Sequence, residues 1–272
     1  MSTTERDYVL GTNDEEIQRL ALQHRVWRPR ALDAWRRAGF TTGQTLLDVG
    51  CGPGHATVDL AGIVGPHGRL VAIDRSRRFL DFLAARRERE SFPAIEVHER
   101  DLETDTLPPA HADGAWVRWV FSFLSHRRDL IGRIRDALRP GGVLVVHEYL
   151  QYDTWRYIPR SPEIEAFVKK VEASWRKDGG EPDVGFELPA WLAEDGFDIR
   201  SLEPVQYIVS PANFVWQWPR AFLATGPRRL VELGQLAEAE CTALERAHAA
   251  LEANPNARCV TPAVLEIIAV RR

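Results

Sequence analysis

Three glycines at alternate positions follow an acidic residue near the start of the chain. Gly50, Gly52 and Gly54 come directly after TLLDV, a short apolar run that contains Asp48. Glycine tolerates turns too tight for residues with a Cβ, and from His55 onward apolar residues recur at helical spacing. A strand that turns through glycines into a helix exposes backbone N–H groups at the helix N-terminus. This pattern predicts a site for the polar parts of a nucleotide-like ligand.

A second acid narrows the class of ligand. Asp74 ends RLVAID, the next apolar run, and lies 20 residues after Gly54. An acid at the tip of the neighbouring parallel strand can accept hydrogen bonds from both hydroxyl groups of an adenosine ribose. A dinucleotide site would require G-x-G-x-x-G, but His55 stands in place of the third glycine. The spacing therefore disfavours a nicotinamide cofactor.

Further landmarks follow in a recognisable order. Asp101 and Leu102 come after the strand-like run 95–99, and are followed by ADGAWVRWVFSFLSH, a helical run to Leu138 and RPGGVLVVHEY. With the glycine turn and the two earlier acids, this order resembles the class I S-adenosylmethionine-dependent methyltransferases. It is similar to their small-molecule branch, which includes the quinone C-methyltransferases, and the resemblance covers residues 40–150.

The resemblance implies S-adenosylmethionine as cofactor and S-adenosylhomocysteine as product. Helices before the first strand commonly cross the cofactor mouth in this family, so Tyr8 and Gln23 become candidate contacts, with packing and surface roles as alternatives. Asp101 either accepts from the adenine amino group or caps the next turn. Arg118 either pairs with Asp48 or contacts the cofactor, or else lies at an exposed edge. The cofactor-binding residues expected are Tyr8, Gln23, Asp48, Gly50, Cys51, Gly52, Gly54, His55, Ile73, Asp74, Arg75, Asp101, Leu102, Arg118 and Trp119.

Catalysis by this family would need little from the protein beyond alignment and a dry pocket, because the sulfonium methyl group is already activated. A general base is needed only where the acceptor must lose a proton. His126, His147, Glu148 and Tyr152 are the candidates, but adjacent strand residues face opposite sides, so His147 and Glu148 cannot both reach one pocket. We expect Glu148 to be the base with Tyr152 beside it, and a structural role is the alternative for His147.

Aromatic residues in the later part of the chain indicate the acceptor. Trp155, Phe214, Trp216 and Trp218 fall in segments expected to cover the cofactor site. Trp216 and Trp218 share one face if their segment is extended. Ordinary packing is the alternative for each residue. Together they predict a small apolar or aromatic methyl acceptor.

The elements that would position these residues form an α/β fold. We expect a Rossmann-like sheet of seven strands, mostly parallel with an antiparallel last strand, helices on both faces and helical lid inserts. Within one overall domain, the divisions expected are a helical cap (1–40), a cofactor-binding core (41–150), a lid insert (151–187), a core helix and strand six (188–210), a helical lid insert (211–261) and the final strand (262–272).

Composition limits the partners. The 272 residues carry 35 Lys plus Arg against 39 Asp plus Glu, a balance that disfavours general binding to nucleic acid. Three cysteines without metal-site spacing, no hydrophobic signal core in MSTTERDYVLG and no apolar run of bilayer length predict a cytoplasmic protein without a membrane partner. The alternatives left open are a methyltransferase of RNA or protein, and a protein that binds S-adenosylmethionine without catalysis.

Overall fold

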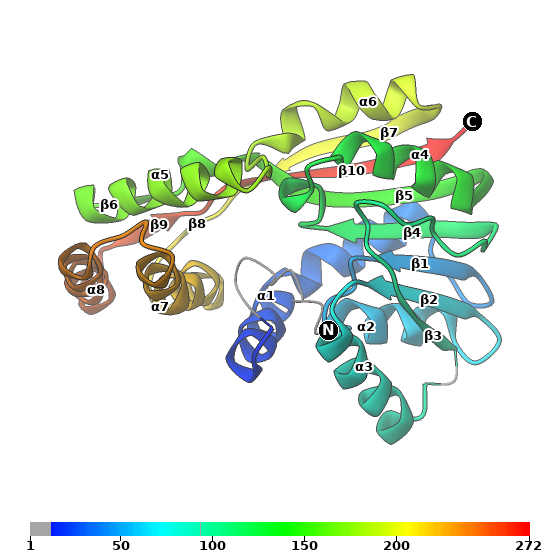
Figure 1. Ribbon diagram of the computed structural model, residues 1–272, viewed down its shortest axis with the longest axis horizontal. Coiled ribbons are helices and arrows are strands. Elements are labelled where there is room, and N and C mark those ends of the chain that lie inside the picture. Colours follow the sequence, from blue (N-terminus) through cyan, green and yellow to red (C-terminus); the bar gives the residue numbers. More distant parts are fainter. Residues whose placement is uncertain (1–11, 93) are drawn as a thin grey trace, which may run out of the picture.

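The structure, a computed structural model, describes residues 12–92 and 94–272. Its centre is a sheet in the order β3–β2–β1–β4–β5–β10–β7 (Figure 1). All neighbouring strands are parallel except β10, which is antiparallel to both β5 and β7. The expected seven-stranded α/β fold is confirmed. The strands are β1 (Thr45–Val49), β2 (Arg69–Asp74), β3 (Ile95–Glu99), β4 (Ala112–Arg118), β5 (Leu138–Gln151), β7 (Phe197–Val205) and β10 (Ala263–Arg271).

Helices cover both faces of this sheet, because its strands are apolar on both sides. One face packs against α1 (Asp14–Ala38), α2 (His55–Val64) and α3 (Arg77–Glu90). The other face packs against α4 (Arg127–Ala137) and α6 (Leu188–Glu194). Figure 1 shows these two layers on either side of the strands. The parallel strands β1, β2 and β4 therefore all end at one edge, where such sheets bind ligands.

The first helix differs from the expectation. The sequence pattern predicts a helix that begins at Thr12 and breaks at Pro29, but α1 is one helix with Pro29 inside it and Asn13 as its N-cap. The Asn13 side chain accepts from the N–H of Glu16 at 2.8 Å. Proline removes one helical hydrogen bond. Buried residues on both sides of Pro29, including Trp27 and Trp35, pack against the rest of the protein and keep the helix continuous.

A second, smaller sheet lies beyond the left-hand end of the main sheet in Figure 1. It has three antiparallel strands in the order β6–β9–β8, and was not expected from the sequence. Its strands have two or three residues, too short for an alternating pattern to be recognised. They are β6 (Arg156–Ile158), β8 (Ile208–Val209) and β9 (Arg258–Val260).

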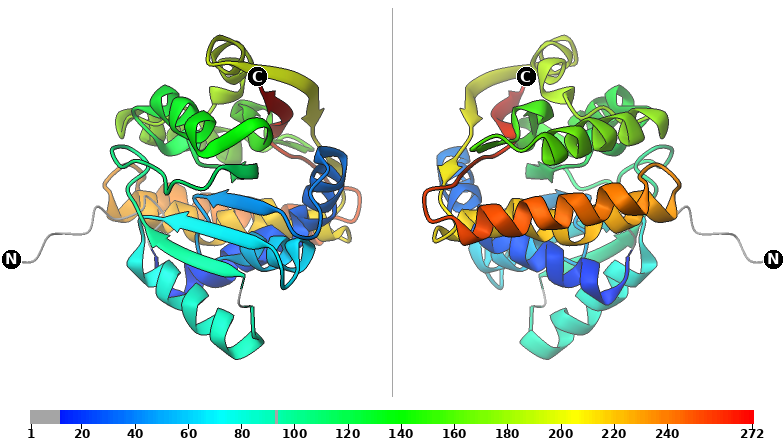
Figure 2. Two further views of the ribbon diagram at one scale, coloured as in Figure 1. Left: turned by 90° about the vertical axis from the view of Figure 1, so that its right-hand side faces the viewer. Right: turned by 90° about the vertical axis from the view of Figure 1, so that its left-hand side faces the viewer.

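Three helices surround the small sheet. They are α5 (Pro162–Lys177), α7 (Gln217–Glu232) and α8 (Glu238–Ala253). Figure 1 shows them at the left-hand end of the molecule, and the right-hand view of Figure 2 faces that end. Their apolar residues form one buried cluster that also includes Trp27 of α1 and Trp119 beyond β4. Short 3₁₀ helices connect several elements, at Phe121–Phe123 (η1), Tyr152–Thr154 (η2), Val184–Phe186 (η3) and Phe214–Trp216 (η4). The inserts are thus packed onto the core by side chains from α1 and the end of β4.

Candidate active site

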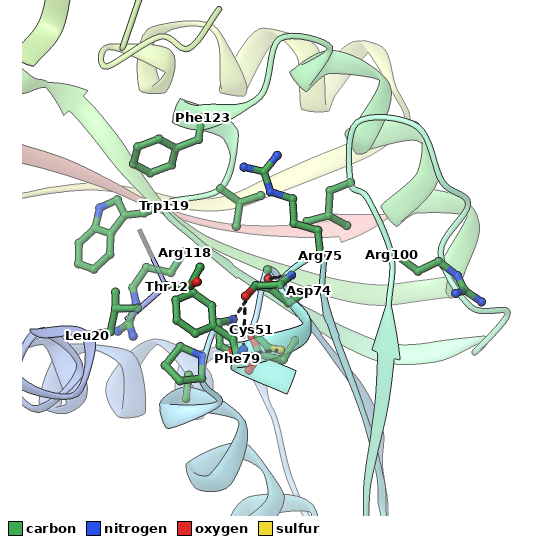
Figure 3. Close-up of a pocket in the computed structure, with 18 of the residues that line it drawn as sticks. Thr12, Leu20, Cys51, Asp74, Arg75, Phe79, Arg100, Arg118, Trp119 and Phe123 are labelled. Carbon is green, nitrogen blue, oxygen red and sulfur yellow. Dashed lines mark hydrogen bonds between the residues drawn. The ribbon is translucent and has the colours of Figure 1, made fainter. Parts of the chain in front are cut away.

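A cavity of about 640 Å³ lies at the edge where β1, β2 and β4 end (Figure 3). Its size is within the range of small-ligand sites. Most residues expected to bind the cofactor line it. These are Gln23, Asp48, Gly50, Cys51, Gly52, His55, Asp74, Arg75, Asp101, Leu102, Arg118 and Trp119.

Two of the expected cofactor residues do not line the cavity. Ile73 is fully buried in the core cluster on the α4 side and does not line the cavity. Gly54 is the N-cap of α2 with a φ of +79°, so it shapes the turn without lining the cavity. Tyr8 lies outside the described residues.

The glycine turn is held tightly between neighbouring elements. Gly50 has a φ of +73°, and a Cβ at this position would overlap Val120 Cγ2. The N–H of Gly52 donates to Asp74 Oδ2 at 2.8 Å, and the N–H of Ser76 donates to Asp74 Oδ1 at 2.9 Å. A carboxylate oxygen can accept more than one hydrogen bond. Asp74 therefore fixes the turn and keeps acceptor capacity beside the cavity.

The other two acids are each partly engaged. Asp48 is buried and accepts from Thr57 Oγ1 at 2.6 Å, and burial raises its pKa to about 6. Asp101 accepts from the N–H of Glu103 at 2.9 Å, so it does cap the turn that follows β3. It also lines the cavity. The two interpretations of Asp101 are therefore compatible.

Arg118 lines the cavity but does not form the expected ion pair with Asp48. It is not at an exposed edge, and within the described residues no carboxylate lies within 4.0 Å of it. Its Nη2 donates to His24 Nδ1 at 3.0 Å, and its guanidinium carbon lies 5.1 Å from the ring centroid of Trp119. Nη1 is buried and has no hydrogen-bond partner in the described part of the chain. Burial lowers the pKa of Arg118 to about 10.

A second, smaller cavity of about 30 Å³ adjoins the first. The two share Gln23, Trp119 and Phe123 in their linings. Trp119 has a φ of +51°, unusual for a bulky residue, and strain of this kind clusters at functional sites. Its indole stacks on Tyr149 and Trp218 at centroid distances of 5.7 Å. Trp119 thus lies at the boundary between the two cavities.

The expected acceptor residues divide into two groups. Trp155 and Trp218 line the smaller cavity, as does Tyr152, which was expected beside the base. Trp216 is instead buried against Tyr157 and His248, and Phe214 is half exposed near Arg25. Trp216 and Trp218 were expected to share a face if their segment is extended, but the segment is helical: Trp216 ends η4 and Trp218 is the second residue of α7.

The structure does not place the expected base in either cavity. Glu148 is fully buried, and its Oε1 accepts from the N–H groups of Val120 and Phe121 at 2.5 and 3.0 Å. Its other oxygen is bound by the Ser122 hydroxyl. Glu148 thus holds the turn after β4, and burial raises its pKa to about 7.

The two histidines considered as bases are also engaged elsewhere. His147 is fully buried, with Nε2 2.8 Å from Glu266 Oε2, and lines neither cavity. His126 is exposed at the start of α4, where its N–H donates to Glu103 Oε2 at 2.9 Å. None of the three candidate bases His126, His147 and Glu148 lines either cavity.

Several lining residues were not expected, among them Thr12, Leu20, Phe79 and Phe123. His24, which holds Arg118, was not expected as a site residue either. A signal existed for Leu20 and His24, since Ile17, Leu20, Ala21 and His24 form one stripe at helical spacing near Gln23. Phe123 carries no such signal, because the turn that presents it depends on the burial of Glu148.

Comparisons with known proteins agree with this arrangement. Residues 46–142 match a family described as a methyltransferase domain. An uncharacterized 37.1 kDa protein in transposon TN4556 of Streptomyces fradiae is 30% identical over 175 residues, which are 63% of this chain and 48% of that protein. A demethylmenaquinone methyltransferase of Lactococcus lactis is 28% identical over 197 residues, 71% of this chain and 73% of that protein. The chain spans about half the length of several other curated relatives.

Solved structures share the fold at low identity. A S-adenosylmethionine-dependent methyltransferase from Aquifex aeolicus superposes with a TM-score of 0.53 and 19% identity, over 70% of this chain and 92% of that one. The cyclase SpnF superposes with a TM-score of 0.56 and 19% identity, over 89% and 80%. These structures support the fold alone. The family match over residues 46–142, the sheet order and the curated relatives together support a class I S-adenosylmethionine-dependent methyltransferase.

Proposed function

We propose that this protein transfers a methyl group from S-adenosylmethionine to a small apolar or aromatic acceptor. The observation that carries the proposal is the pair of adjoining cavities with Trp119 at their boundary. The larger cavity suits the cofactor, and the smaller one is lined mainly by aromatic side chains. An acceptor beside Trp119 would meet the cofactor at the shared boundary.

The residues of the larger cavity fit the chemistry of the cofactor. Asp74 retains acceptor capacity for ribose hydroxyl groups, and the glycine turn allows a ligand to approach the backbone closely. Arg118 Nη1 and Trp119 Nε1 are buried polar atoms without partners in the described residues, as expected where a ligand completes the hydrogen bonding. When bound, S-adenosylmethionine supplies an electrophilic methyl group on a sulfonium.

The smaller cavity favours an apolar acceptor that fills an aromatic enclosure. Trp119, Tyr152, Trp155, Trp175 and Trp218 are among its walls. A volume of about 30 Å³ holds roughly two water molecules, so a substrate must displace side chains or extend into the larger cavity. We propose that the inserts 151–187 and 211–261 act as the lid that adjusts, because they supply many of these walls.

The lining also bears on how the acceptor is activated. Within residues 12–92 and 94–272, no carboxylate or imidazole lines the smaller cavity. Burial raises the pKa of the Tyr152 hydroxyl, which therefore stays protonated near neutral pH. These residues align the acceptor and exclude water, and the arrangement favours an acceptor whose reacting atom is already nucleophilic. The methylated atom is not assigned.

Two alternatives remain as outcomes of the test. A methyltransferase of RNA or protein would need a macromolecule to reach an enclosed aromatic cavity. A binding protein without catalysis would keep the cofactor site and lack turnover. The fold does not distinguish these two alternatives from the proposed function, because one fold can support different functions. Cytoplasmic location stays a prediction; over the described residues, no helix has the length and apolar character to cross a bilayer.

The first test is calorimetric titration with S-adenosylhomocysteine, with NAD as control ligand. We expect micromolar binding of the first and none of the second. S-Adenosylhomocysteine release would then be followed with a naphthoquinol, a catechol, a tRNA pool and a peptide pool as acceptors, and one of the two small molecules should support turnover. Binding of NAD alone would contradict the proposal that S-adenosylmethionine is the cofactor. Turnover with only tRNA or peptide would contradict the proposal of a small-molecule acceptor.

A further inference from the structure

Resting on that function, we propose that Arg118 binds the methionine carboxylate of the cofactor through Nη1, and that His24 and Asp59 position Arg118 for this contact. Arg118 is a half-buried cation with a buried Nη1 atom, and among the described residues no carboxylate lies within ion-pair distance of it.

Arg118 differs from the other buried or half-buried arginines near α1. Arg19 pairs with Glu16, and Arg30 and Arg37 both pair with Glu266. Arg118 has instead a neutral partner, His24, and the faces of Trp116 and Trp119. Asp48 favours the charged form of Arg118 but lies beyond ion-pair distance. A buried cation is costly unless it is paired, so an anionic ligand is the expected partner.

A hydrogen-bonded chain holds the guanidinium in place. His24 Nε2 lies 3.0 Å from Asp59 Oδ2, and Arg28 Nε donates to the same carboxylate at 2.6 Å. Because Arg118 Nη2 must donate, His24 Nδ1 accepts and its proton sits on Nε2, facing Asp59. This chain runs from β4 through α1 to α2. It orients Nη2 toward His24 and leaves Nη1 beside the cavity.

The order of the strands assigns the anion to one end of the cofactor. Asp74 ends β2 and Arg118 ends β4, and β1 with its glycine turn lies between these strands. Figure 3 shows Arg118 to the left of Asp74, with Cys51 close to Asp74. A ligand whose ribose meets Asp74 therefore extends over the glycine turn toward Arg118. On that side S-adenosylmethionine carries its carboxylate, and the adenosine part carries none.

The test compares two ligands in binding, without turnover. S-Adenosylhomocysteine has the carboxylate, whereas 5′-methylthioadenosine shares the adenosine and thioether but lacks the amino-acid end. For Arg118→Met we expect the Kd of S-adenosylhomocysteine to rise roughly ten- to hundredfold, the effect of losing a charge-assisted hydrogen bond, with the Kd of 5′-methylthioadenosine within about twofold. The control Arg139→Met removes an arginine that pairs with Asp113 away from the cavity and should change neither value.

The positioning role is tested at His24. His24→Leu removes the acceptor for Arg118 and should weaken S-adenosylhomocysteine several-fold without affecting 5′-methylthioadenosine. His24→Asn places an amide oxygen near the position of Nδ1 and should restore most of the affinity. A structural role alone would weaken both ligands in parallel, and thermal melting identifies variants that fail to fold.

The outcomes separate this proposal from the proposed function. Equal weakening of both ligands by Arg118→Met, or no weakening of either, overturns the carboxylate contact while the cofactor stands. If Arg118→Met does not fold, Arg118→Gln takes its place, because it keeps a polar side chain but loses the charge, and an unchanged ratio of the two Kd values would overturn the contact. Wild-type protein that binds neither ligand contradicts the cofactor itself.

Discussion

The acidic residues near the strand ends have two different roles. Asp74 and Asp101 line the cavity while also accepting from backbone N–H groups. Glu148 does not line either cavity, and its carboxylate accepts hydrogen bonds from the turn after β4. Asp74 and Asp101 thus face the proposed ligand site, whereas Glu148 supports local structure.

A substitution at Asp74 tests the proposed contact between its carboxylate and the ribose of the cofactor. Asp74→Asn keeps one acceptor oxygen for the backbone but loses the charge, so we expect the Kd of S-adenosylhomocysteine to rise at least roughly tenfold. The Kd of 5′-methylthioadenosine should rise in parallel, because both ligands contain the ribose. Calorimetric titration measures both. Asp74→Ala is a poorer probe than the sequence alone suggests, since it would also release the N–H of Gly52. A variant with wild-type affinities would remove Asp74 from the site.

Glu148 tests the corrected role of the expected base. Glu148→Gln can still accept from Val120 and Phe121 and donate to Ser122, so we expect turnover and cofactor affinity close to wild type. Glu148→Ala leaves buried N–H groups unpaired and should lower the free energy of unfolding by about 2 kcal/mol or more. Chemical denaturation and an activity assay measure the two effects. A large loss of turnover in Glu148→Gln with intact stability would restore the catalytic role.

At the scale of elements, the site depends on how two turns meet. The glycine turn after β1 and the turn after β4 touch at Gly50 and Val120, and Glu148 of β5 holds the second turn. Neither turn could adopt this position alone, because each is supported by a neighbouring strand. The cavity is therefore a product of three adjacent strand ends.

A matched pair of glycine variants tests this contact. Gly50→Ala combines a φ of +73° with an overlap against Val120, whereas Gly52→Ala has a φ of +54° and open space around its Cβ. We expect Gly52→Ala to lower the free energy of unfolding by about 1–3 kcal/mol through backbone strain, and Gly50→Ala to lower it further. Thermal or chemical unfolding measures the difference. Equal losses would show that the approach of Val120 does not constrain Gly50.

At the scale of the whole molecule, a buried charge network joins α1 to the antiparallel edge of the sheet. Glu266 of β10 is fully buried and binds His147, Arg30 and Arg37. Burial opposes its ionisation, but His147 and the two arginines outweigh burial and lower the pKa of Glu266 to about 2. The network thus fixes the helix that supplies Gln23 and His24 to the site.

Glu266 gives the protein an acid-dependent component of stability. Because its folded-state pKa is below its ordinary value of 4.5, its contribution is present above pH 4.5 and is lost as the pH falls toward 2. Glu266→Gln should lower the free energy of unfolding by about 3 kcal/mol at pH 7, since it leaves buried cations uncompensated. The difference from wild type should narrow between pH 4.5 and 2 in denaturation measured across pH. A difference that stays constant would contradict the assignment.

The sequence determined the core and its cofactor side. Strand, glycine turn and helix are encoded over a few residues, and acids at strand ends meet because parallel strands end at one edge. Asp48, Asp74, Asp101 and the glycines could therefore be placed by spacing. The order of landmarks also identified the family and the antiparallel last strand.

Only the tertiary structure decided the rest of the site. In the sheet, Glu148 faces the turn after β4 and His147 faces Glu266. Alternation along the strand places the two side chains on opposite faces, but it does not tell which side chain takes which face. The small sheet β6–β9–β8 and the continuous α1 depend on packing between segments distant in sequence. That packing brought His24 to Arg118 and Trp218 to Trp119. Contacts between distant segments follow from the geometry of the whole fold, which local spacing does not encode.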